Sequence, residues 1–204
     1  MIIEVGNIVR DKLAVLSFID KLTGVVKVIT MTDVDSDNKP VKKTFPVSCD
    51  TSFTECVNDQ KYKDFMPNSS LGCMVYLEDQ GLRPEGTNGS KEKWKATYKL
   101  IGWINSAKLG YSDCSITGQI VATIMKKFPI TAFNQGIYHT IMIKVASQDP
   151  KTGANPFVRY SYDEDKTQYL MFPYDYFSLN VEVSFEINKK CISDFVALPG
   201  IECP

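Results

Sequence analysis

The chain has 204 residues, a net charge of −1 at pH 7, 44% hydrophobic residues and 23% charged residues. This composition is that of a globular protein with a buried core, and it excludes a wholly disordered chain. Proteins that bind nucleic acid mainly through its phosphates are normally basic, so the nearly neutral charge argues against that class. The N-terminal stretch carries charges at Glu4, Arg10, Asp11 and Lys12, and no long apolar run follows. We therefore expect neither a signal peptide nor a membrane span.

The first part of the chain predicts a helix followed by a hairpin. Apolar residues recur at three- and four-residue steps from Val5 to Ile19, which predicts a helix, and Gly24 would stand just beyond its end. The composition then becomes β-branched, which is typical of strands. The predicted elements are a strand over 25–31, a polar turn over 33–40 and an antiparallel return strand over 41–49.

The rest of the chain alternates strands with one strong helix. The predicted elements are a short helix over 51–58, a strand over 72–78, a loop over 80–92, a strand over 93–105, a helix over 114–128, and strands over 137–147 and 176–187. In the strand over 93–105, Trp94, Ala96 and Tyr98 share one face, and the lysines share the other. We therefore expect the rings in the core and the lysines in solvent.

This order of elements predicts an α+β fold, with an antiparallel or mixed sheet, two helices packed on one face, and long loops. We expect a single α/β-sandwich domain over 1–204, because neither side of the loop at 80–92 has enough elements to close a core. A second irregular segment, rich in aromatic residues, is predicted over 148–175.

No residue set that catalysis requires is visible along the chain. His139 is the only histidine, and no Gly-x-Ser-x-Gly turn accompanies it, so a sheet-face residue is the simpler interpretation. Asp33, Asp35 and Asp37 have the spacing of a calcium loop, but the glycine and glutamate that complete that pattern are absent. The six cysteines fit no zinc motif, and we expect reduced thiols. We predict no catalytic residues, no cofactor and no metal, although an active site assembled from scattered residues stays open.

An aromatic-rich segment, 157–177, is the most unusual part of the sequence. Tyrosine offers a large contact area with a polar end, which suits protein interfaces and sugar platforms. The segment could equally fold down as a lid over the core. Its candidate interface residues are Phe157, Tyr160, Tyr162, Tyr169, Phe172, Tyr174 and Tyr176. Together with the lysines of 91–99, these rings keep open an alternative function, a single-stranded nucleic-acid or carbohydrate binding module.

Five stretches carry a family resemblance: GNIVRDKLAVLSFIDKLTGVVKVIT, KTFPVSCD, NSSLGCMVYLED, YKLIGWINSAKLG and YLMFPYDYFSLNVEVSFEI. Together they resemble neck or tail-connector (tail-terminator-like) structural proteins of tailed bacteriophages, including crAss-like phages of Bacteroidales. The resemblance covers most of the chain and consists of these short stretches and of the order of the predicted helices and strands.

The resemblance implies a non-enzymatic subunit of the virion, made in the host bacterial cytoplasm. Such a subunit forms a homo-oligomeric ring between portal and tail, and its loops reach neighbouring portal, neck or tail proteins. Non-specific contact with DNA in the channel is compatible with that position, and no membrane contact is expected. The family brings no catalytic residues to this chain.

Overall fold

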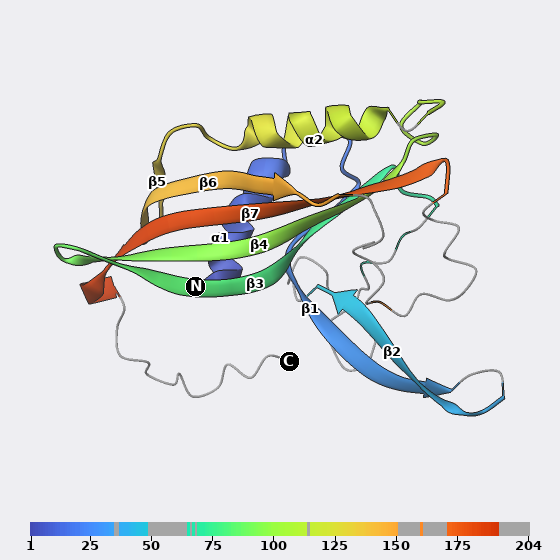
Figure 1. Cartoon of the computed structure of the whole chain (residues 1–204), viewed down its shortest axis with the longest axis horizontal. Helices are drawn as coiled ribbons and strands as arrows, with labels where there is room; N and C mark the ends of the chain where they lie inside the picture. The colour runs from blue at the N-terminus through green and yellow to red at the C-terminus, as the bar shows by residue number, and fades with distance from the viewer. Residues whose placement is uncertain are drawn as a thin grey trace.

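The computed structural model describes residues 1–34, 37–48, 65, 67, 69–113, 115–150, 160 and 171–191. Within these residues the strands form one seven-stranded sheet in the order β2-β1-β3-β4-β7-β6-β5 (Figure 1). The elements are α1 (Ile2–Leu13), β1 (Lys21–Val34), β2 (Pro40–Val47), β3 (Cys73–Asn88), β4 (Lys91–Asn105), α2 (Ile116–Lys127), β5 (Phe133–Gln135), β6 (Tyr138–Gln148), β7 (Tyr174–Asn188) and a short 3-10 helix (Lys189–Cys191).

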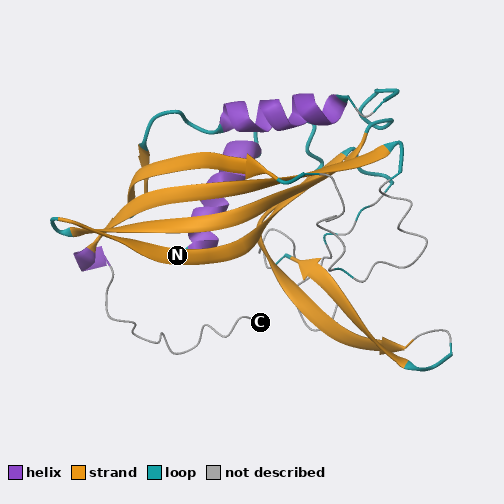
Figure 2. Ribbon diagram, viewed as in Figure 1, coloured by secondary structure: helices purple, strands orange, loops and turns teal. Residues whose placement is uncertain are grey.

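The sheet is mixed, because β1 and β3 run parallel whereas the other neighbouring strands are antiparallel. Both helices cover the same face, as Figure 2 shows for α1 crossing the strands and α2 running along them. Their apolar stripes join the inward side chains of the strands in one buried cluster, which includes Val9, Leu13, Tyr98, Ile124 and Val181. The predicted α+β fold, with two helices on one face of a mixed sheet, is confirmed.

The first helix ends earlier than predicted. α1 stops at Leu13, and the chain turns before Lys21 instead of continuing to Ile19. Leu16 lies in that turn but is still buried, so the apolar spacing outlasts the helix. Gly24 is not a helix cap either. It lies in β1, where an added Cβ would meet Oδ1 of Asn7 at 2.3 Å, so its absent side chain lets α1 lie against the strand.

The predicted loop over 80–92 is wrong, because β3 and β4 continue through it as a long hairpin. The glycines that suggested a loop sit at irregularities in the pairing. Gly81 and Gly86 have φ of 123° and 120°, and the register shifts beside each of them. Such bulges need a positive φ that glycine adopts without steric cost. A bulged hairpin and a loop therefore have the same local composition.

The opposite face of the sheet carries a second, smaller core at one end. On β4 the side chains that point away from the helices are first lysines and then Ile101 and Trp103. Ile101 and Trp103 are fully buried. They pack with side chains from β1, β3 and two isolated described positions: Val26, Phe65, Met74, Tyr76 and Tyr160. This face is therefore polar along the hairpin and aromatic near the start of β3.

One strand changes partners and leaves the body of the sheet. β1 pairs with β3 from Lys21 to Val26 and with β2 from Lys27 to Val34. The second half of β1 and the whole of β2 thus form a two-stranded projection, which we call the arm (Figure 1). The predicted hairpin over 25–49 is confirmed, but its projection from the sheet was not foreseen.

The predicted helix over 114–128 is present, and its apolar residues form one buried stripe. Ile116, Ile120, Val121, Ile124 and Phe128 are all buried. The N-cap is Ser115, which makes no side-chain cap bond. β5 was not predicted, because three residues are too short to show a pattern. The predicted helix over 51–58 lies outside the described residues.

Candidate interaction surface

The seven aromatic interface candidates divide into three groups. Phe157, Tyr162 and Tyr169 lie outside the described residues. Tyr160, Tyr174 and Tyr176 pack against the second core, where Tyr174 stacks on Trp103 with ring centroids 5.2 Å apart. Phe172 is 59% exposed, next to Met171 at 69%. The part of the segment that is described therefore covers the core with most of its rings and leaves Phe172 exposed.

The lysines of β4 point away from the helices, as predicted, but acidic residues accompany them. Lys95 Nζ lies 3.0 Å from Glu182 and 3.6 Å from Glu85, and Lys99 Nζ lies 2.8 Å from Asp149. Lys91 and Lys93 lie 3.6 and 3.9 Å from Glu186. Because each positive charge has a carboxylate beside it, this face lacks the uncompensated positive potential that attracts a phosphate backbone.

Glu186 is the hub of the hairpin tip. Its carboxylate accepts hydrogen bonds from Asn88 and Thr140, both at 3.1 Å, in addition to the two lysines. The hydrogen bond from Asn88 holds the pKa of Glu186 below its ordinary value. His139, the only histidine, lies in β6 as the backbone partner of this residue. These contacts tie β3, β6 and β7 together, which is a structural task.

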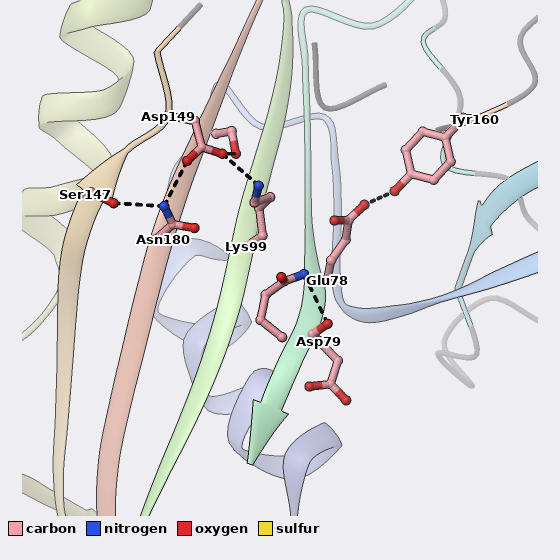
Figure 3. A network of polar contacts seen from close by, with 9 residues as sticks. Glu78, Asp79, Lys99, Ser147, Asp149, Tyr160 and Asn180 are labelled. Atoms are coloured by element: carbon pink, nitrogen blue, oxygen red, sulfur yellow. Dashed lines mark hydrogen bonds and ion pairs between the residues drawn. The ribbon is translucent and has the colours of Figure 1, made fainter. Parts of the chain in front are cut away.

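Asp149 is a second hub, at the end of β6. It accepts hydrogen bonds from Ser178 at 2.8 Å and Asn180 at 2.9 Å, in addition to its ion pair with Lys99 (Figure 3). Partial burial alone would raise the pKa of Asp149, but the bonds from Lys99, Ser178 and Asn180 together lower it. Asn180 also donates to Ser147 at 2.8 Å. This network joins the end of β6 to the middle of β4 and β7.

Glu78 is the most unusual polar residue, and the sequence did not single it out. It lies on β3 with 3% of its surface exposed, and it accepts a hydrogen bond from the Tyr160 hydroxyl (Figure 3). Burial raises its pKa to about 8, although Lys99 nearby lowers it in part. A strand pattern cannot reveal this burial, because the covering ring comes from a distant part of the chain.

The described residues contain no group of three or more histidine, cysteine or acidic side chains placed to bind a metal ion. A hollow of about 340 Å³ lies beside the end of α1. Its charged lining residues already have structural partners. Arg10 binds Asp11 at 2.8 Å, and Asp20 accepts bonds from the backbone of Gly72 and Cys73. None of the described helices is both long and apolar enough to cross a membrane.

The arm presents an exposed β-surface of mostly uncharged side chains, on which Lys42 lies opposite Thr32. Val28, Thr30 and Thr32 follow one another on one face of β1, and all three are exposed. The hydroxyls of Thr30 and Thr44 lie 3.1 Å apart across the two strands. At the base of the arm, the Phe65 amide donates to the Pro46 carbonyl at 2.9 Å. The sequence does carry a signal for this surface. The alternate residues 28, 30 and 32 carry no charge, whereas the outer face of a strand that meets only water is usually polar and charged.

A scan of the chain against protein-family models found no match, and searches of curated proteins and of solved structures found none either. The likeness to phage neck and tail-connector proteins therefore rests on the sequence stretches alone.

Proposed function

We propose that this chain is a non-enzymatic structural subunit of a virion, which forms a ring in the neck or tail connector of a tailed bacteriophage. The family resemblance supports the class of protein, and the arm is the structural observation that carries the assembly role. The partners would be further copies of the chain and the adjoining portal, neck or tail proteins.

The physical argument starts from the arm itself. A two-stranded hairpin without further cover is at best marginally stable in water. Here the strands leave the sheet and expose Val28, Thr30 and Thr32, which are β-branched side chains without charge. Such a surface is stabilised when another protein covers it. A projection that contacts a different surface on the next copy makes a head-to-tail interface, and head-to-tail interfaces close into rings when the rotation permits.

The test is to place charges on this surface without disturbing the core. We expect the double variant Val28→Glu, Thr32→Glu to fold like the unmodified chain, because both positions are exposed, but to lose assembly. Assembly is measured as mass by light scattering, with the chain alone and with the portal and tail proteins proposed as its partners. The matched control is Ile130→Glu, at a position that is 97% exposed and outside the arm.

Loss of assembly in the arm variant, with assembly retained in the control, supports the proposal. If the arm variant assembles as well as the unmodified chain, the arm is not needed for assembly. If the unmodified chain stays monomeric with every neighbouring virion protein, the proposal of a ring is wrong.

A further inference from the structure

The arm leaves one edge of β1 without a strand beside it. From Lys27 to Asp33, β1 pairs with β2 on one side, whereas β3, its neighbour on the other side, pairs with it only as far as Val26 (Figure 1). None of the described strands takes the place of β3 along 27–33. An open edge of this kind is a template for a further strand, because its row of N–H and C=O groups has no neighbouring strand to bind.

The residues that turn their backbone groups toward this open edge can be identified from the pairing with β2. In an antiparallel pair, two opposite residues either exchange both backbone hydrogen bonds or point both groups away from each other. Pro46 lies opposite Val28, has no N–H to donate, and accepts a bond from the Phe65 amide at its carbonyl at 2.9 Å. Its carbonyl therefore points away from β1, and Val28 points its own groups away from β2. By alternation along the strand, Thr30 and Thr32 do the same.

Other edges of the described sheet carry features that oppose the addition of a strand. Bulges beside Gly81 and Gly86 interrupt β3 in the part that β1 has left, and β2 has a proline at or beside each end. Lys144 stands in the part of β6 that extends beyond β5. Bulges, prolines and lysines all discourage pairing at an edge. The stretch 28–32 of β1 contains no proline, glycine or charged residue, so it is the least protected of these edges.

The residues around Thr30 match an antiparallel copy of themselves. If two copies of β1 pair with Thr30 opposite Thr30, each Lys27 lies opposite Asp33 of the second copy, and each Val28 lies opposite Thr32 of the second copy. Opposite charges directly across an antiparallel pair are stabilising, and like charges are destabilising. A register displaced by two residues, the next that keeps the same backbone orientation, loses both charge pairs. The charges therefore favour the register centred on Thr30.

We propose that two copies of this chain pair through the open edge of β1, antiparallel and with a twofold axis at Thr30. The two arms then form one continuous sheet in the order β2-β1-β1-β2. The contact is isologous, since the same edge of each copy meets the other, and its affinity comes from main-chain hydrogen bonds. It uses the edge of the arm and leaves the faces of the arm uncovered, so the dimer and the proposed ring are compatible and neither requires the other.

The test reverses the charges at the two ends of the paired stretch. Lys27→Asp and Asp33→Lys each place like charges opposite one another at both ends of a dimer of identical copies. We expect the Kd of the dimer, measured by analytical ultracentrifugation over a concentration series, to rise at least about tenfold in each single variant. The double variant Lys27→Asp, Asp33→Lys restores opposite charges and should recover the Kd of the unmodified chain.

An equal mixture of the two single variants gives the sharpest result. One copy then carries only acidic residues at 27 and 33, and the other carries only basic residues, so we expect the mixture to form mixed dimers although neither variant pairs well alone. The matched control is Lys126→Asp, at an exposed position of α2 outside the arm, which should leave the Kd unchanged. Circular dichroism checks that each variant is folded.

An unmodified chain that never reaches the mass of a dimer would overturn the proposal. Single variants that dimerise as well as the unmodified chain, or a mixture that does not recover the dimer, would overturn the register centred on Thr30. The result is distinguishable from that of the proposed ring. A dimer without any larger assembly supports the pairing and speaks against the ring, whereas a ring that is unaffected by both charge reversals speaks against the pairing alone.

Discussion

Gly102 offers the sharpest test of the packing between the two central strands. It lies in β4 as the backbone partner of Phe177 in β7, and the ring of Phe177 lies directly over it. An added Cβ would meet Cε1 and Cζ of that ring at 2.1 Å. Real Cβ atoms do not approach carbon so closely, and Phe177 is only 1% exposed within the main core. The variant Gly102→Ala must therefore displace the ring or the strand.

Overpacking of a well-packed core costs about 1–3 kcal/mol, and we expect Gly102→Ala near the upper end of that range. The reason is that the ring has packed neighbours on its other side. Replacing Phe177 by Leu shrinks the obstructing side chain and leaves some empty space. The double variant should consequently lose less stability than the sum of the two single variants, by at least about 1 kcal/mol.

The assay is equilibrium unfolding in urea, followed by tryptophan fluorescence and by circular dichroism to check two-state behaviour. Gly118→Ala is the matched control. It lies exposed on α2, where an added Cβ would meet nothing within 4 Å, and we expect a gain of about 0.5–1 kcal/mol there. A Gly102→Ala variant within about 0.5 kcal/mol of the unmodified chain, or additive losses in the cycle, would refute the packing argument.

Three further predictions concern polar contacts. Glu78→Gln should weaken the dependence of the free energy of unfolding on pH. In the unmodified chain, the raised pKa of Glu78 stabilises the fold below pH 4.5, and this stability is lost as the pH rises to about 8. The difference between 4.5 and about 8 sets the full loss at about 5 kcal/mol at most. Equal slopes in the variant and the unmodified chain would contradict this. Glu186→Gln should cost about 1–2 kcal/mol by urea unfolding, because Asn88 and Thr140 lose a charged acceptor, whereas Glu182→Gln, which weakens one ion pair with Lys95, should cost under about 1 kcal/mol. Similar losses at both glutamates would show that the two hydrogen bonds to Glu186 contribute little. Asp20→Ala should cost about 1–2 kcal/mol by thermal unfolding, and Asp20→Asn less, because the amide oxygen can still accept the two backbone bonds; equal losses would rule out that role.

The sequence predicts the faces of long elements well, because burial imposes a period that many residues share. The alternation along β4 places its rings and lysines on the expected faces, and α2 forms where the helix over 114–128 was predicted. The sequence-based prediction is wrong where one local pattern of residues can arise from two different structures. Gly81 and Gly86 mark bulges within a hairpin, and a loop would have used the same residues for the same positive φ. Leu16 continues the helical spacing of α1 because a turn can also bury an apolar side chain.

The candidate surface was less predictable than the fold. The sequence indicated the aromatic segment, but it did not distinguish rings that cover the second core, such as Tyr174, from Phe172, which is exposed. Glu78 looked like an ordinary polar strand residue, since its burial depends on Tyr160. The arm was predicted as a hairpin, but its departure from the sheet depends on where β1 exchanges β3 for β2, and no local pattern encodes that point.

The most direct test of the proposed function is the mass of the unmodified chain in solution, measured by light scattering over a concentration series, alone and with the portal and tail proteins proposed as its partners. The account predicts a discrete closed oligomer in at least one of these conditions, and the same oligomer should disappear in the arm variant Val28→Glu, Thr32→Glu. A strict monomer in every condition, combined with saturable and salt-sensitive binding of oligonucleotide or with binding of glycan, would contradict the account and favour a binding module.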